Sequence, residues 1–128
     1  MTYSTECGWA VMACGNKFEA MMGYGTLYGD TCGAVVPLGD LFKTEVYAMA
    51  ELYPQIPRGI ITRPASAELS PNQKDSDSMP DYAILDPILA DIENGVNRND
   101  ELFTSIRKRV NNAAFKRVQM PPVLKLGE

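Results

Sequence analysis

Catalytic chemistry in this chain has to rest on carboxylates, lysines, arginines and hydroxyl groups, or on a divalent cation held by oxygen atoms, because its 128 residues include no histidine. That absence excludes serine and cysteine nucleophiles activated by histidine, and most zinc sites. The three cysteines, Cys7, Cys14 and Cys32, have spacings that match no metal-binding knuckle. Their odd number, in a chain whose polar start does not resemble a secretory signal, predicts reduced thiols.

Side chains of the required types gather in three stretches. The first joins Glu19 to a run of glycines from 23 to 33, and such a glycine density lets the backbone bend tightly and approach a ligand closely. The second contains Lys43 at the start of a helical pattern. The third is the aperiodic segment 64–80, rich in proline and polar residues. A loop of this length inside a compact domain is usually functional or disordered.

The elements that must position these stretches begin with the apolar run 9–14, which predicts a buried strand ended by Gly15 and Asn16. Asn16 is suited to cap a helix from Lys17 to about residue 24, with Glu19 in the first turn, where a carboxylate complements the helix dipole. From 39–40 onward a second helix is expected, ended by Pro54. Its predicted apolar face comprises Leu41, Val46, Met49, Ala50 and Leu52.

Three more helices and an extended arm are predicted after that. A short helix is expected around 57–61, a longer one from Asp81 to about Glu93, and a third from Asn99 or Asp100 to about Phe115. The residues of the third that should face inward are Leu102, Phe103, Ile106 and Val110. Residues 120–123 should be extended. The pattern indicates about five helices and one clear strand, whose missing neighbours suggest an α/β sheet completed elsewhere.

Composition and charge exclude several classes of partner. The net charge of −4 argues against non-specific nucleic-acid binding, which needs clustered Lys and Arg, and the one basic cluster, 107–109, is expected to be a solvated helix face. No apolar run approaches the roughly 20 residues that span a membrane. We therefore expect a cytoplasmic protein without nucleic-acid or membrane partners.

Four motifs, the first of them in two parts, follow one another in an order and spacing that resemble the NAD⁺ synthetases, especially the glutamine-dependent bacterial type. They are GNKFE at 15–19, GYGTLYGD at 23–30, PLGDLFKTEVY at 37–47, RPASAELSPNQKD at 63–75 and FKRVQMPP at 115–122. The resemblance implies that residues 1–128 are the C-terminal half of an adenine-nucleotide alpha-hydrolase-like domain of the PP-loop ATPase type. The fold expected from it is an α/β fragment, mostly helical, with one or few strands.

The family reaction implied is the ATP-dependent amidation of deamido-NAD⁺ through an adenylate, assisted by Mg²⁺. Negative charge on the transferring phosphate must then be offset by cations and aimed hydrogen bonds. The resemblance assigns Glu19 to a catalytic carboxylate near ATP and Mg²⁺, and Lys43 to a lysine on the ATP phosphate. The ligand contacts that it implies are Thr26, Asp30, Ser66 and Lys116. It also implies that the segment 64–80 closes over the site and that the chain pairs as a homodimer.

The chain departs from the family in two ways. It has no Ser-Gly-Gly-x-Asp-Ser loop to cradle the ATP pyrophosphate, and no glutaminase domain. Phe18 stands where the family carries serine, and its ring is expected to block or restructure the site beside Glu19. We therefore expect a partial synthetase that is inactive alone or complemented by a second chain. The alternatives are a non-enzymatic, self-associating helical module derived from that domain, and a helical scaffold unrelated to nucleotides.

Overall fold

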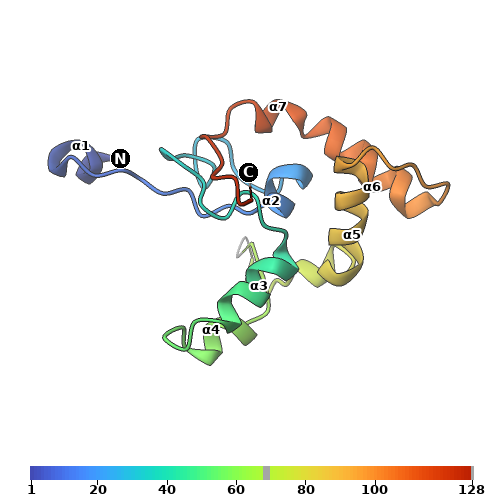
Figure 1. Cartoon of the computed structure of the whole chain (residues 1–128), viewed down its shortest axis with the longest axis horizontal. Coiled ribbons are helices and arrows are strands. Elements are labelled where there is room, and N and C mark those ends of the chain that lie inside the picture. Colours follow the sequence, from blue (N-terminus) through green and yellow to red (C-terminus); the bar gives the residue numbers. More distant parts are fainter. Residues whose placement is uncertain (68–69, 128) are drawn as a thin grey trace.

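The centre of the fold is a short helix, α2 (Lys17–Met22), against which three later helices pack. The computed structural model describes residues 1–67 and 70–127. Figure 1 shows α2 near the middle of the molecule, with α5 (Tyr82–Glu93), α6 (Glu101–Asn112) and α7 (Ala114–Arg117) curving round one side of it. The buried side chains that join them are Phe18, Met21, Met22, Phe42, Met79, Leu85, Ile88, Leu89, Phe103, Ile106 and Val110.

The start of α2 is held by a capping box, and six residues are too few for a stable isolated helix. The Asn16 side chain accepts a hydrogen bond from the Glu19 amide, and the Glu19 carboxylate accepts one from the Asn16 amide, each at 3.0 Å. These bonds satisfy two donors at the helix start. The predicted cap at Asn16 is confirmed, while the helix ends at Met22, slightly earlier than predicted.

Three cationic side chains of the C-terminal helices bind the carbonyl groups at the other end of α2. The donors are Arg109, Lys116 and Arg117, and their acceptors are the carbonyl oxygens of Met22, Gly23 and Met21, in that order, at 3.3, 2.8 and 2.9 Å. Positive charge suits a helix C-terminus, where carbonyl groups lack partners within the helix. The two ends of α2 are therefore both fixed by side chains.

Gly23 ends α2 in a conformation that other residues rarely adopt. Its φ is +63°, in the left-handed region. A Cβ atom at this position would lie only 2.6 Å from the Cβ of Ala113, next to α7. Glycine at 23 is therefore required both for the backbone turn and for the close packing of the C-terminal helices.

The helices α5 and α6 agree with the sequence patterns that predicted them. The Asp81 side chain accepts from the Ala83 amide at 2.8 Å, and the Asp100 side chain accepts from the Phe103 amide at 2.7 Å. The prediction that Leu102 faces inward is wrong, because Leu102 is 37% exposed and is not part of the hydrophobic core. The last predicted helix is also broken at Ala113, where α6 gives way to α7.

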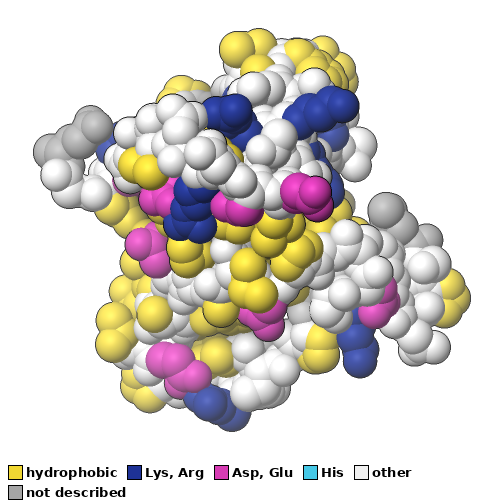
Figure 2. Space-filling model, turned by 90° about the vertical axis from the view of Figure 1, so that its right-hand side faces the viewer, with side chains coloured by type: hydrophobic (Ala, Val, Ile, Leu, Met, Phe, Trp, Pro, Cys, Tyr) yellow, Lys and Arg dark blue, Asp and Glu magenta, His cyan; other side chains and the backbone are white. Residues whose placement is uncertain are grey.

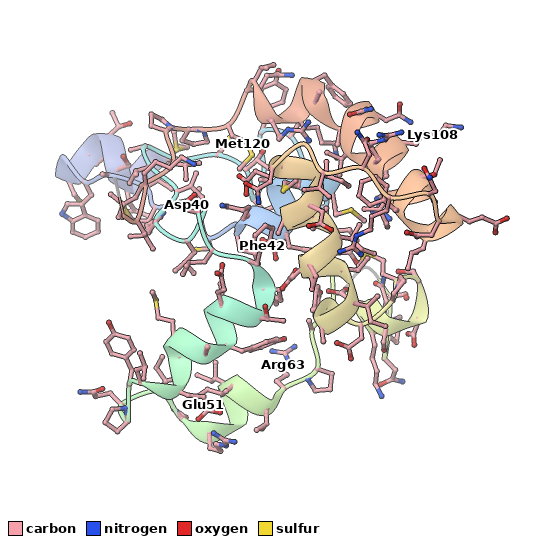
Figure 3. All side chains as sticks on the ribbon, turned by 45° about the vertical axis from the view of Figure 1, so that its right-hand side comes forward. Asp40, Phe42, Glu51, Arg63, Lys108 and Met120 are labelled. Atoms are coloured by element: carbon pink, nitrogen blue, oxygen red, sulfur yellow. The ribbon has the colours of Figure 1, made fainter. Side chains whose placement is uncertain are left out.

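The helices α3 (Lys43–Glu51) and α4 (Arg58–Thr62) project from this core (Figures 1 and 3). An ion pair between Glu51 and Arg58 joins them. The predicted apolar face of α3 is not buried: no residue of that helix is buried, and Leu52 after it is 77% exposed. The pattern was correct for a helix, but most residues of α3, including Val46 and Met49, are only half-buried against their neighbours α4 and α5.

A buried carboxylate of α5 fixes the start of α3. Phe42, at the N-cap position, has no atom that can cap the helix. Asp86 supplies the missing acceptor, because its Oδ2 accepts a hydrogen bond from the Thr44 amide at 2.8 Å. Asp86 is 4% exposed, and this burial raises the pKa of its carboxyl group. This hydrogen bond links the first turn of α3 to α5.

The segment 9–14 is extended but is not the buried strand that its apolar run predicts. Trp9 is 65% exposed and Met12 is 52% exposed, whereas Ala13 is buried. In the described residues, pairing is limited to two isolated parallel bridges, from Met12 to Val35 and from Val36 to Val123. The preceding helix α1 (Thr2–Cys7), which the sequence analysis did not predict, has no buried residues and lies apart from the body (Figure 1).

Seven α-helices and a 3-10 helix, η1 (Asp75–Asp77), make up the regular structure of the described residues, so the fold is mostly helical with little strand. Figure 2 shows a face on which positive and negative side chains lie close together, with hydrophobic side chains exposed between them. Within the described part of the chain, no helix is long and apolar enough to cross a membrane.

Asp40 ties the C-terminal segment to the start of α2. Its carboxylate accepts hydrogen bonds from the Lys125 ammonium at 3.0 Å and from the Leu126 amide at 3.1 Å, and it pairs with Lys17 at 3.2 Å. The bond from the Leu126 amide, followed by that from Lys125, lowers the pKa of Asp40 from 3.8 to about 2. The ionised form is therefore favoured in the folded chain.

The tight packing at Gly23 predicts that Gly23→Ala lowers the free energy of unfolding more than Gly95→Ala does. Gly95 is the matched control. Gly95 also has a positive φ, +71°, but a Cβ there would meet no atom within 4 Å. We expect Gly95→Ala to lower the free energy of unfolding by about 1 kcal/mol through backbone strain. Gly23→Ala should cost roughly a further 1–3 kcal/mol through overpacking against Ala113. Equal losses of stability in urea denaturation would contradict this close packing of Gly23 against Ala113.

The Asp40 contacts should make part of the stability depend on pH. Because the folded-state pKa of about 2 lies below the unfolded value of 3.8, the stabilisation is complete above pH 3.8 and is lost as the pH falls towards 2. Asp40→Asn should lower the free energy of unfolding by about 1 kcal/mol at neutral pH. The difference from the parent chain should close in acid. A difference that stays constant down to pH 2 would show that the charge of Asp40 contributes nothing.

Candidate functional site

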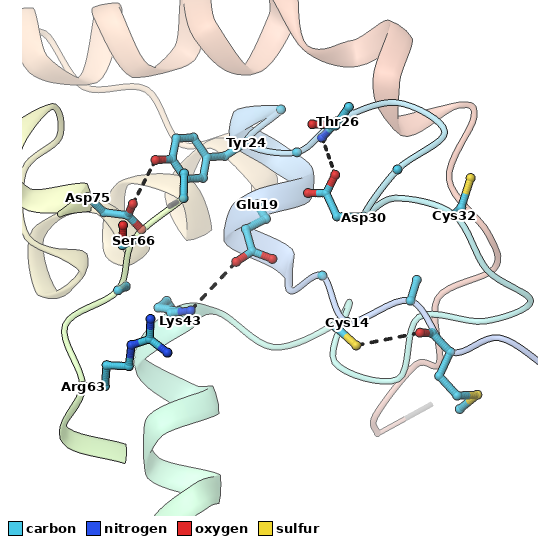
Figure 4. Close-up of a pocket in the computed structure, with 18 of the residues that line it drawn as sticks. Cys14, Glu19, Tyr24, Thr26, Asp30, Cys32, Lys43, Arg63, Ser66 and Asp75 are labelled. Atoms are coloured by element: carbon cyan, nitrogen blue, oxygen red, sulfur yellow. Dashed lines mark hydrogen bonds and ion pairs between the residues drawn. The ribbon is translucent and has the colours of Figure 1, made fainter. Parts of the chain in front are cut away.

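An open cavity of about 980 Å³ lies beside α2, between the glycine-rich turn, the start of α3 and the segment after α4 (Figure 4). Five of the six residues predicted to form the site line it, namely Glu19, Thr26, Asp30, Lys43 and Ser66. The rest of the wall includes the segments 11–15 and 23–25, together with Tyr47, Arg63 and Asp75. Tertiary structure thus brings together segments that lie far apart in the sequence.

Glu19 and Lys43 face each other across the cavity wall (Figure 4), with 3.8 Å between Oε1 and Nζ. The other carboxylate oxygen of Glu19 accepts the hydrogen bond from the Asn16 amide that caps α2. Burial raises the pKa of Glu19, and the negative charges of Asp30 and Asp75 add to the effect, against the opposing contributions of Asn16 and Lys43. Lys43 therefore compensates the negative charge of the Glu19 carboxylate only in part, and this carboxylate is suited to bind a further cation.

Aromatic rings hold the Lys43 ammonium in place. It lies 5.7 Å from the ring centroid of Tyr47 and 5.8 Å from that of Tyr82. Cation–π contacts at such distances favour a defined position for the charge. The Lys43 side chain is 19% exposed at the cavity surface. An ammonium with three donors, held at the mouth of a cavity, is suited to bind an anion such as a phosphate.

Thr26 and Asp30 form the glycine-rich turn itself. The Asp30 carboxylate accepts a hydrogen bond from the Thr26 amide at 2.6 Å, and the Thr31 hydroxyl donates to the Thr26 carbonyl at 2.9 Å. The turn approaches Asp30 so closely that a Cβ on Gly25 would lie 3.0 Å from its Oδ2. Asp30 therefore organises the turn, and it also contributes negative charge to the cavity.

Lys116 lies outside this cavity and lines a smaller space behind it. Its ammonium donates to the carbonyl groups of Gly23 and Gly25, at 2.8 Å each. The resemblance to the family implies that this lysine contacts a ligand. In the structure Lys116 binds the backbone of the glycine-rich turn on the side away from the cavity. Two of the three N–H donors of its ammonium make these bonds.

The expectation that Phe18 blocks the site is wrong, whereas its restructuring of the site stays a prediction. The ring of Phe18 is fully buried, at 0% exposed, and it does not line the cavity. It packs edge-on against Tyr82, with 4.8 Å between ring centroids. Consecutive residues of a helix point about 100° apart, so Phe18 enters the core while Glu19 faces the cavity.

Ser66 and Arg63 reach the cavity on the segment that follows α4. Residues 68–69 of the predicted loop lie outside the described residues. The end of that loop contains a residue that the sequence analysis did not single out: Asp75 is 6% exposed, and its carboxylate accepts hydrogen bonds from the hydroxyls of Tyr24 and Tyr82. No local pattern reveals this cluster, because Tyr24 is 51 positions away from Asp75.

Known proteins with similar sequences are NAD(+) synthetases. The NH(3)-dependent NAD(+) synthetase of Archaeoglobus fulgidus is 45% identical over 119 residues, which are 92% of this chain and 47% of that protein. The glutamine-dependent NAD(+) synthetase of Xanthomonas campestris is 48% identical over 95 residues, which are 70% of this chain and 17% of that protein. The chain therefore spans about half, or less, of the length of these relatives.

A solved structure and a family-wide comparison agree with these similarities. The NMN synthetase of Francisella tularensis superimposes with a TM-score of 0.74 at 26% identity, over 99% of this chain and 50% of that one. The sequence model of the NAD synthase family matches residues 1–121. With nearly all of its sequence covered by that match, and with the motif residues gathered round one cavity, the chain belongs to the NAD synthase family.

Proposed function

We propose that this chain supplies part of an NAD⁺ synthetase active site, in which the cavity beside α2 binds the phosphates of ATP next to deamido-NAD⁺. The single observation that carries the proposal is the pairing of Glu19 with Lys43 at 3.8 Å in the cavity wall. The reaction of the family joins the nicotinate carboxylate to the α-phosphate of ATP and releases pyrophosphate. Ammonia then displaces AMP to give the amide.

In this proposal Lys43 is the cation that binds a phosphate oxygen. Its position beside Tyr47 and Tyr82 is fixed before a ligand arrives, so little reorganisation opposes binding. Ser66 adds a hydroxyl from the facing segment. Thr26 and Asp30 present the glycine-rich turn to deamido-NAD⁺, and Lys116 acts through the backbone of that turn.

The residues fit Mg²⁺ that is shared with ATP rather than a site made of protein alone. Mg²⁺ takes one or two protein carboxylates and completes its shell with phosphates and water. Glu19 is suited to this role because its buried carboxylate is only partly neutralised by Lys43. In the described residues, no group of three or more His, Cys, Asp or Glu side chains could hold a metal. When bound, Mg²⁺ would offset the negative charge on the phosphate oxygens.

The chain by itself is proposed to be inactive. Its sequence contains no loop of the kind that cradles the pyrophosphate, and it spans 47% of the A. fulgidus relative. Losing one donor to a developing anion typically costs roughly 10²–10³ in rate, and here a whole set of donors is absent from the sequence. Binding of ATP and catalysis should therefore be separable.

A second candidate is a non-enzymatic module that self-associates. It is favoured by the large apolar side chains at the surface, which include Trp9, Met12, Leu52 and Leu124. Exposed apolar area of this kind promotes association. A chain that remains monomeric in light scattering at high concentration would exclude this candidate, and a homodimer that binds no nucleotide would favour it.

Lys43→Ala should weaken the binding of ATP with Mg²⁺ by about 10–100-fold, because the phosphate loses a charge-assisted hydrogen bond. Glu19→Gln should weaken it mainly when Mg²⁺ is present. Lys108→Ala is the matched control, since Lys108 is exposed on α6 and points away from the body (Figure 3). Calorimetric titration measures all three. Equal affinity in the Lys43 variant and the parent chain would contradict the proposed role of the cavity.

The parent chain should form no detectable NAD⁺ from deamido-NAD⁺, ATP, Mg²⁺ and ammonia, although it binds ATP. Product formation is measured by chromatography, with a complete synthetase as the positive control. Nicotinate mononucleotide should be tested in parallel, because the F. tularensis neighbour is an NMN synthetase. Turnover by this chain with either substrate would show that the loop absent from its sequence is dispensable.

A further inference from the structure

We propose that Asp75 is a positioning residue of this site: its buried carboxylate, bound by the hydroxyls of Tyr24 and Tyr82, seats the segment 63–67 against the cavity. We call the three side chains, Tyr24, Asp75 and Tyr82, the carboxylate latch. The seating of the segment can be tested without any ligand. Its consequence for phosphate binding rests on the proposed function.

The carboxylate latch joins three parts of the chain that are distant in sequence. Asp75 lies in η1 and is 6% exposed. Its Oδ1 accepts a hydrogen bond from Tyr24, just after α2, at 2.9 Å, and its Oδ2 accepts one from Tyr82, the first residue of α5. Figure 4 shows Asp75 and Tyr24 meeting at the edge of the cavity, next to Ser66.

Both oxygens of the Asp75 carboxylate are therefore occupied by hydroxyl donors. Burial, together with the hydrogen bonds to Asp75, raises the pKa of Tyr24 and of Tyr82, so both hydroxyls stay protonated at neutral pH. A buried ionised group that loses one of its donors bears a large desolvation cost. The bonds are accordingly expected to hold Asp75 firmly.

The backbone of Asp75 transmits this position to the cavity wall. Its amide donates to the carbonyl of Ala65 at 3.0 Å. Ala65 lies between Arg63 and Ser66, which line the cavity. On the other side, the carbonyl of Asp75 accepts from the amide of Met79 at 3.1 Å, and Met79 is part of the hydrophobic core. Asp75 thus links the segment 63–67 to the core.

The ring of Tyr82 connects the latch both to the hydrophobic core and to Lys43. Phe18 packs edge-on against this ring at 4.8 Å, and the Lys43 ammonium lies 5.8 Å from its centroid. The ring of Tyr82 therefore contacts both Phe18 in the core and the Lys43 ammonium, while its hydroxyl donates to Asp75. Phe18 acts here as a support for the site.

The test removes one hydroxyl at a time. Tyr24→Phe and Tyr82→Phe keep both rings, and Asp75→Asn keeps the shape of the side chain while removing its charge. Tyr53→Phe is the matched control, because the side chain of Tyr53 is 53% exposed and lies outside the cavity. Amide hydrogen exchange of the ligand-free chain should become about tenfold faster in the three latch variants, both at Asp75, whose amide donates to Ala65, and in 63–67, where every residue except Pro64 carries an amide. Exchange in α6 should stay unchanged.

A second measurement connects the latch to binding. The dissociation constant for ATP with Mg²⁺ should rise by about threefold to tenfold in the latch variants, because residues 63–67 are no longer held in place. Tyr53→Phe should change neither quantity. A residue that merely stabilises the fold would speed exchange in α6 as much as in 63–67, and that result would overturn the proposal.

The two possible failures can be told apart. Unchanged exchange at Asp75 and in 63–67 in all three variants would overturn the latch, whatever the affinity for ATP. If the parent chain binds no ATP while the variants still open locally, the latch is supported and the proposed function is wrong. Local opening together with unchanged ATP affinity would overturn the positioning role of Asp75.

Discussion

The fixing of α2 at both of its ends is the constraint on which the rest of this structure depends. A helix of six residues has little stability of its own. The capping box at Asn16 satisfies its first amides, and three cations from α6 and α7 satisfy its last carbonyls. Because those cations come from the C-terminal helices, the start of the cavity wall and the end of the chain form one structural unit.

Adjacent positions on α2 have opposite environments, and this places the site directly on the core. Phe18 is fully buried among aromatic and aliphatic side chains, while Glu19 faces the cavity. Tyr82 lies between these environments, since it packs against Phe18 and donates a hydrogen bond to Asp75. A change in the packing of the core would therefore be expected to alter the geometry of Glu19, Lys43 and the carboxylate latch together.

The charges round the cavity explain why it suits a ligand that brings cations and anions together. Glu19, Asp30 and Asp75 contribute negative charge, whereas Lys43 is the cation paired with Glu19. Inside a partly buried site, electrostatic interactions are screened less than in water. Arg63 adds a second cation to the lining, so a phosphate accompanied by Mg²⁺ would match both the cations and the carboxylates of the cavity. This balance agrees with the ligands proposed for a member of the NAD synthase family.

The sequence by itself determined the local structure and the family. The caps at Asn16, Asp81 and Asp100, and the apolar spacing of α5 and α6, depend on neighbours a few residues away, so they are visible in the order of the residues. The motifs that identify the family are equally local, and five of the six predicted site residues do line one cavity.

Only the tertiary structure decided which surfaces are covered and which side chains act from a distance. The segment 9–14 looks buried in sequence but is mostly exposed, and the apolar residues of α3 are only half-buried, because burial depends on layers that no local pattern specifies. Phe18 enters the core, and Lys116 supports the turn from behind. Asp75 meets Tyr24 across 51 positions. Such contacts depend on how the helices pack, and that packing is fixed only when the whole chain is folded.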